Sequence, residues 1–104
     1  MKGLYILRNK LAVPVATVEE WGRFFQTENR IVAVEQIGGY TISTVFLGVD
    51  HSFGGDLPIL FETMIFGPDH DTVDMDRCGT WEEAIDMHER MVALVVAKIS
   101  ADAP

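Results

Sequence analysis

The sequence predicts a single α+β domain over residues 1–104, in which two helices cover an antiparallel sheet of about five or six strands. Six short runs rich in β-branched and aromatic residues are joined by connections too short for parallel crossovers. Two Thr-x-x-Glu pairs each precede a stretch with helical apolar spacing. The predicted order of elements is ββαββββα, with a long C-terminal helix.

The first half of the chain predicts a hairpin, a helix and a second hairpin. Residues 5–7 and 11–15 flank a polar turn, and Pro14 places the second of these strands at a sheet edge. Thr17 and Glu20 form the first capping box, so a helix is expected over 18–27. Strands 30–37 and 40–49 are joined by a Gly-Gly pair that suits a tight turn.

The second half predicts a polar loop, two strands and the long helix. Residues 50–58 contain two Gly and one Pro, so they form a loop before a strand at 59–66. A more exposed strand is expected at 73–77. The capping box of Thr80 and Glu83 begins a helix over about 81–99, whose apolar stripe comprises Trp81, Ala84, Ile85, His88, Met91, Val92, Val95 and Ile99.

This last helix is apolar all round from residue 91 to residue 97, and one side of a helix suffices to cover a sheet. Something else must therefore cover its outer side. Either the first helix packs over it through Phe24 and Phe25, or a second copy of the chain does. We expect a homodimer through the C-terminal helix, since symmetric dimers are the commonest oligomers.

Composition excludes several classes of protein. Apolar residues make up 48% of the chain, too many for a disordered tail, and no apolar run approaches the roughly 20 residues of a membrane span. No secretory signal is recognisable at the N-terminus, and the single Cys78 fits a cytoplasmic location. No cofactor motif occurs, so none is expected.

The net charge of −8 is concentrated in the second half, where residues 49–104 carry three basic and twelve acidic side chains. A field of this sign repels phosphates and argues against direct nucleic-acid binding through a basic patch. The acidic half is interpreted either as solvated surface or as a face that occupies a partner's basic groove.

The 50–58 loop is the first candidate site, because it places titratable and hydroxyl side chains next to two glycines. Its candidate residues for binding a ligand or partner are Asp50, His51, Ser52, Phe53 and Asp56. The structural alternative is that Asp50 makes an Asx-type turn and His51 closes the loop by hydrogen bonds.

Glu62 is the second candidate, as the only charge within the 59–66 strand. A hairpin symmetric about its loop places Glu62 opposite Phe46 and diagonal to Thr44, with His88 as another conceivable partner. Either these are satisfied structural pairs, or Asp50, His51, Glu62 and His88 form a catalytic pocket with His51 as base.

The acidic stretch 69–76 resembles a metal loop only superficially. Counted from Asp69, an EF-hand needs Gly at its sixth position and Glu at its twelfth, where this chain has Asp74 and Thr80. His and Cys spacing does not match a zinc site either. No metal site is predicted, and the stretch is interpreted as an exposed hairpin tip.

Two segments carry a resemblance. The sequences Ser-Thr-Val-Phe-Leu-Gly-Val-Asp-His-Ser-Phe-Gly-Gly at 43–55 and Leu-Phe-Glu-Thr-Met-Ile-Phe-Gly at 60–67 are similar to a family of small proteins encoded by bacteriophages and prophages. Val13, Pro14, Val15, Trp21, the 80–84 segment and His88 extend the similarity. The resemblance implies a setting in the cytoplasm of a bacterial host, and it implies no site residues.

We therefore expect a small binding protein without catalytic activity, acting as an antagonist of a host defence or nucleic-acid-handling protein. The alternative is a small-ligand-binding protein or hydrolase with a polar pocket at the 50–62 hairpin.

Overall fold

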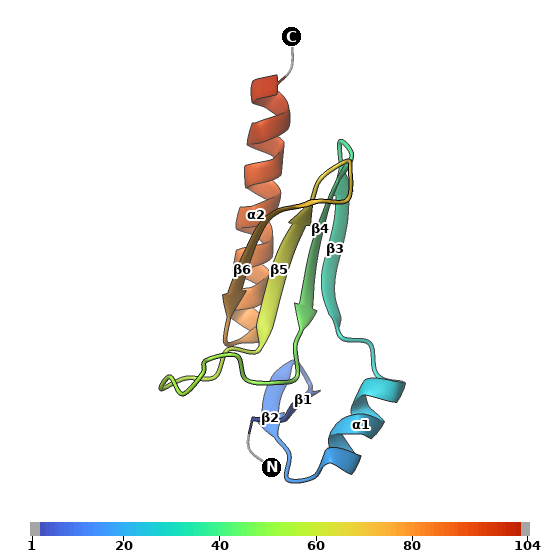
Figure 1. The fold of residues 1–104 in the computed structure, drawn as a ribbon, viewed down its shortest axis with the longest axis vertical. Helices are drawn as coiled ribbons and strands as arrows, with labels where there is room; N and C mark the ends of the chain where they lie inside the picture. The colour runs from blue at the N-terminus through green and yellow to red at the C-terminus, as the bar shows by residue number, and fades with distance from the viewer. Residues whose placement is uncertain (1–2, 103–104) are drawn as a thin grey trace.

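The computed structural model describes residues 3–102 and confirms the predicted α+β class and the order ββαββββα (Figure 1). Its strands and helices are β1 (Tyr5–Arg8), β2 (Leu11–Pro14), α1 (Val18–Thr27), β3 (Ile31–Ile37), β4 (Tyr40–Phe46), β5 (Phe61–Phe66), β6 (Thr72–Cys78) and α2 (Trp81–Asp102). At both helix starts the predicted N-cap forms, because the backbone N–H of Glu20 donates to Thr17 Oγ1 and that of Glu83 donates to Thr80 Oγ1.

The six antiparallel strands divide into two sheets rather than one. β1 and β2 form a two-stranded sheet, and β3, β4, β5 and β6 form a four-stranded sheet in chain order. Helix α2 packs along one face of the larger sheet and contacts all four of its strands. Helix α1 does not share that face; it packs against β1 at the lower end of the molecule in Figure 1.

β4 ends at Phe46, three residues before its predicted end, because the chain turns at Gly48 toward β1. The carbonyl of Gly48 accepts hydrogen bonds from the backbone of Tyr5 (2.9 Å) and from the indole of Trp21 (3.0 Å). A Cβ at this position would lie 2.1 Å from Phe25, and φ is +77°. Only glycine meets both requirements, so the junction between the two sheets depends on it.

The hydrophobic core has two parts along the length of α2. The lower cluster joins β1, α1, the sheet and the start of α2; it comprises Leu4, Ile6, Val15, Phe24, Phe46, Leu60, Phe61 and Ala84. The upper cluster comprises Ile42, Ile65, Met91 and Val95. Between them on the same strands lie Thr44 and Thr63, both fully buried. The core is thus interrupted by a polar layer.

The outer side of α2 is not covered by any other part of residues 3–102. Since α1 lies at the opposite end of the molecule from residues 91–97, the alternative in which Phe24 and Phe25 cover them is excluded (Figure 1). Leu94 is 49% exposed and Val96 is 47% exposed.

Neither helix of the described residues has the length and apolar character needed to cross a bilayer.

Candidate functional site

Asp50 fixes the two ends of the 50–58 loop to each other. Its Oδ1 accepts hydrogen bonds from the backbone N–H of Ser52 (2.8 Å) and of Ile59 (2.9 Å), and its Oδ2 accepts one from the Ser52 hydroxyl (3.0 Å). The N–H of Ile59, and then that of Ser52, lowers the pKa of Asp50 below its usual value of 3.8. Asp50 therefore acts as a clamp, as the Asx-turn interpretation expects.

His51 completes this clamp. Its backbone N–H donates to the carbonyl of Ile59 (2.9 Å), and its ring Nδ1 lies 2.7 Å from the carbonyl of Val49. Because a carbonyl can only accept, Nδ1 carries the proton in this bond. The ring also meets Phe53 edge to face, with 6.4 Å between centroids. His51 thus orders both the base of the loop and its tip.

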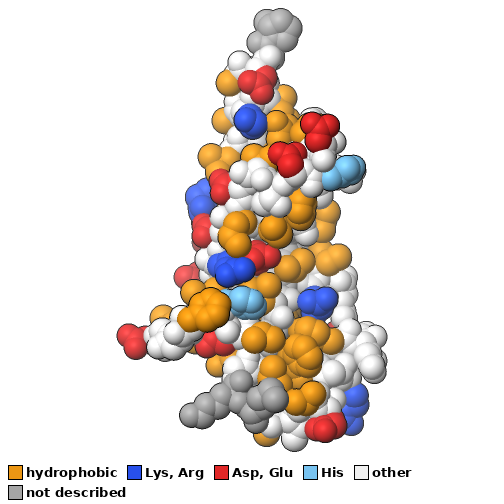
Figure 2. All heavy atoms as spheres, in the orientation of Figure 1, with side chains coloured by type: hydrophobic (Ala, Val, Ile, Leu, Met, Phe, Trp, Pro, Cys, Tyr) orange, Lys and Arg blue, Asp and Glu red, His pale blue; other side chains and the backbone are white. Residues whose placement is uncertain are grey.

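The loop presents two large hydrophobic side chains to solvent. Phe53 is 90% exposed and Leu57 is 78% exposed. Phe53 also has a φ of +54°, in the left-handed region that residues other than glycine rarely adopt. Figure 1 shows the loop projecting from the body near the start of α2, and Figure 2 shows hydrophobic and acidic side chains side by side on this projection. An aromatic residue is held here in a strained, exposed position.

Glu62 is not opposite Phe46. The register places it across from Val45, one residue away from the predicted position. This shift turns Glu62 to the face of the sheet that α2 leaves open, where Arg77 Nε donates to it (2.9 Å). Neither Thr44 nor His88 is its partner, because both lie on the covered face.

His88 instead belongs to the polar layer of the core. Its Nδ1 lies 2.7 Å from Thr44 Oγ1, which lies 2.5 Å from Thr63 Oγ1. Its Nε2 lies 3.0 Å from Glu35 Oε1 at the β3 edge. The His88 side chain is 5% exposed, whereas that of Glu35 is 49% exposed. Four elements, β3, β4, β5 and α2, are therefore joined by one chain of hydrogen bonds.

The order carboxylate, imidazole, hydroxyl is also that of nucleophilic active sites, but the burial differs. A nucleophile must reach its substrate, whereas Thr44 is 0% exposed. In residues 3–102, every buried side-chain nitrogen or oxygen has a hydrogen-bond partner. The arrangement is that of a satisfied structural network, and Asp50, His51, Glu62 and His88 do not form one constellation.

The acidic stretch 69–76 continues into β6, an edge strand of the larger sheet. The backbone N–H groups of Met75 and Arg77 donate to the carboxylates of Asp74 and Asp76, respectively, each at 2.8 Å. Alternate residues of an edge strand direct their N–H groups outward, so these carboxylates occupy donors that another strand would use. The two carboxylates therefore protect the edge from pairing with another strand.

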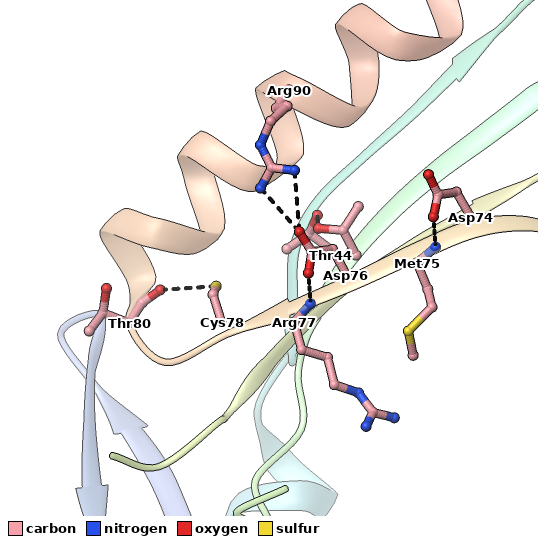
Figure 3. Close-up of polar contacts among 9 residues, drawn as sticks. Thr44, Asp74, Met75, Asp76, Arg77, Cys78, Thr80 and Arg90 are labelled. Atoms are coloured by element: carbon pink, nitrogen blue, oxygen red, sulfur yellow. Dashed lines mark hydrogen bonds and ion pairs between the residues drawn. The ribbon is translucent and has the colours of Figure 1, made fainter. Parts of the chain in front are cut away.

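Asp76 has a second role, visible in Figure 3. Both terminal nitrogens of Arg90, on α2, lie 3.2 Å from Asp76 Oδ2 on β6. The same view shows Cys78, whose Sγ lies 3.8 Å from the carbonyl of Thr80. Burial, with a contribution from Glu83, raises the pKa of the Cys78 thiol to about 11. This thiol is therefore protonated at neutral pH.

Several carboxylates of the acidic half are thus engaged within the chain. They clamp the 50–58 loop, pair with arginines, accept from backbone N–H groups or accept from the Thr80 hydroxyl; they are Asp50, Glu62, Asp74, Asp76 and Glu83. Among the described residues, no three His, Cys, Asp or Glu side chains gather as metal ligands would. The 50–58 loop differs from this acidic surface in that it also exposes two large hydrophobic side chains, Phe53 and Leu57.

Comparisons with protein-family models, with curated proteins and with solved structures find no match for this chain. Sequence reasoning missed Leu57, Glu35 and Thr63. Glu35 and Thr63 could have been found from the sequence, because each is a polar residue within a strand whose other side chains are mostly apolar.

Proposed function

We propose that this protein is a binding protein without catalytic activity, and that its 50–58 loop inserts Phe53 into a pocket of a partner protein. The observation that carries the proposal is the 90% exposure of Phe53 on a loop whose base is clamped by Asp50. Aromatic residues are enriched in the cores of interfaces, where a few side chains supply most of the affinity.

The clamp supports binding because it orders the loop before the partner arrives. A loop that is already fixed loses little conformational entropy on association. The positive φ of Phe53 supports the same proposal, since a glycine would adopt this conformation without strain. Burying the Phe53 side chain is worth about 1.5–3 kcal/mol, or roughly a 10- to 100-fold gain in affinity.

The partner class rests on the sequence resemblance. Similarity to phage- and prophage-encoded proteins suggests a protein of the bacterial host, in the cytoplasm, among those that act in defence or handle nucleic acids. The engaged carboxylates of the second half favour the loop over the acidic surface as the contact.

Photo-crosslinking tests this proposal directly. The photoreactive amino acid p-benzoylphenylalanine replaces Phe53 in one variant and Leu94, exposed on the far part of α2, in the control. In lysate of a bacterial host, position 53 is expected to give a discrete adduct that position 94 does not, and Leu57→Ser is expected to weaken it. Identical adducts from both positions, or no adduct at position 53, contradict the proposal.

A further inference from the structure

Two neighbouring hollows lie next to the 50–58 loop, where three distant segments meet. Two hollows of about 300 Å³ and 210 Å³ share Pro58, Gly79 and Thr80 in their walls. We call the pair the Pro58 groove. Gly79 permits the close approach that forms its floor, because a Cβ there would lie 2.7 Å from the carbonyl of Pro58.

The walls of the Pro58 groove are largely apolar. The larger hollow is bordered by Leu57, and the smaller one by Tyr5, Leu11 and Trp81. Leu11 is 65% exposed, so that Phe53, Leu57 and Leu11 are the three most exposed large hydrophobic residues of the described chain. Two of these three line the groove, and the third lies four residues from Leu57. Such a concentration of exposed apolar surface is typical of a docking site.

The charges around the Pro58 groove favour a positively charged ligand. Glu83 lines the larger hollow and Glu82 the smaller, while Lys10 is the basic residue among the lining side chains. Lys10 Nζ lies over the Trp81 ring, 5.6 Å from its centroid. Glu82 has no hydrogen-bond or ion-pair partner in residues 3–102. An unpaired carboxylate beside an apolar wall favours a ligand that brings both a hydrophobic side chain and a positive charge.

We propose that the Pro58 groove binds an extended segment of the partner protein in which a bulky apolar side chain stands next to Lys or Arg. Two hollows that share three wall residues suit neighbouring side chains of one extended segment. The apolar side chain contacts Leu11 and Trp81, and the basic side chain pairs with Glu82. This rests on the proposed function, since the segment would belong to the partner that receives Phe53.

Selection from a displayed library of random nonapeptides tests the groove. Peptides are selected on the immobilised full chain, and the enriched ones are then labelled and measured by fluorescence anisotropy. We expect enriched sequences to place Lys or Arg within two positions of a bulky apolar residue. Leu11→Ser is expected to weaken binding about 10-fold and Glu82→Lys severalfold. Leu94→Ala, a matched exposed leucine outside the groove, is expected to leave binding unchanged.

Four results overturn the groove proposal: no enrichment, enrichment of acidic peptides, unchanged binding to Leu11→Ser, or sedimentation showing that a second copy occupies this surface. Failure of the loop proposal is separable. If the adduct from position 53 persists in Leu11→Ser while no peptide binds, only the groove assignment fails. If peptides bind the groove but position 53 gives no adduct, only the role of Phe53 fails.

Discussion

Replacing Thr44 by valine is the most severe test of the polar layer, because the Thr44 hydroxyl is hydrogen-bonded to both Thr63 and His88. Valine keeps the shape of the side chain but removes both hydrogen bonds, at 2.5 Å and 2.7 Å. It leaves a fully buried hydroxyl and a nearly buried ring nitrogen without partners. Each such unsatisfied group destabilises a fold by about 1–3 kcal/mol. We expect Thr44→Val to lower the free energy of unfolding by about 2–6 kcal/mol, a large share of the 5–15 kcal/mol typical of a domain.

Guanidinium unfolding followed by far-ultraviolet circular dichroism measures this change, provided that the m-value stays constant. Thr41→Val is the matched control, because Thr41 lies on the same strand and its hydroxyl makes no hydrogen bond within the described residues. It is expected to change stability by less than about 0.5 kcal/mol. If Thr44→Val changes the free energy of unfolding as little as the control does, the hydrogen bonds of the polar layer do not stabilise the fold.

A triple variant gives the second half of this test. Thr44→Val, Thr63→Val and His88→Leu together remove every buried polar group of the layer and leave Glu35 in contact with water. Replacing all partners by apolar groups of similar shape can be nearly neutral. The triple variant is therefore expected to be more stable than Thr44→Val alone, and simple addition of the single effects contradicts the network.

Three further predictions concern the loop, the edge strand and the thiol. Because hydrogen bonds lower the folded-state pKa of Asp50, the stability that its clamp contributes is present above the usual value of 3.8 and is lost as pH falls through the lower folded value. The Ile59 amide should accordingly stay protected from exchange, relative to an unstructured peptide at the same pH, down to pH 3.8, and its protection should fall only below that pH. In Asp50→Ala this protection should be lost already at pH 7. The double variant Asp74→Ala and Asp76→Ala should self-associate more strongly than wild type in sedimentation velocity, since it frees two edge donors; a monomer at matched concentration opposes this. The absorbance of the Cys78 thiolate should titrate with a midpoint near 11, and a midpoint near 9 opposes the burial argument.

The local features of the fold were predictable because short-range chemistry determines them. Both Thr-x-x-Glu boxes begin helices at the expected residues, and the Gly-Gly pair joins β3 to β4. The end of β4 was not predictable in this way. It depends on Gly48 meeting Phe25 and Trp21, which are more than 20 positions away in the sequence, and no local pattern records that contact.

The candidate site was predicted in part for the same reason. Asp50 and its turn are local, and the structure places them as the Asx interpretation expects. The partner of Glu62 depends on a register that the loop midpoint does not determine, and an error of one residue exchanged the two faces of the sheet. His88 was correctly placed on the buried stripe, but its partner Glu35 is 53 residues away.

Phe53 contributes to contact with a partner rather than to folding if the proposed function is correct, and the variant Phe53→Gly separates these two roles. Glycine adopts the observed φ of +54° without strain, so the variant should be at least as stable as wild type in thermal unfolding. The decisive measurement is the dissociation constant of the cross-linked partner for this variant and for wild type. We expect the affinity of Phe53→Gly to be reduced by about 10-fold or more, since a buried aromatic anchor is lost. Equal affinity for Phe53→Gly and wild type would contradict the proposed function.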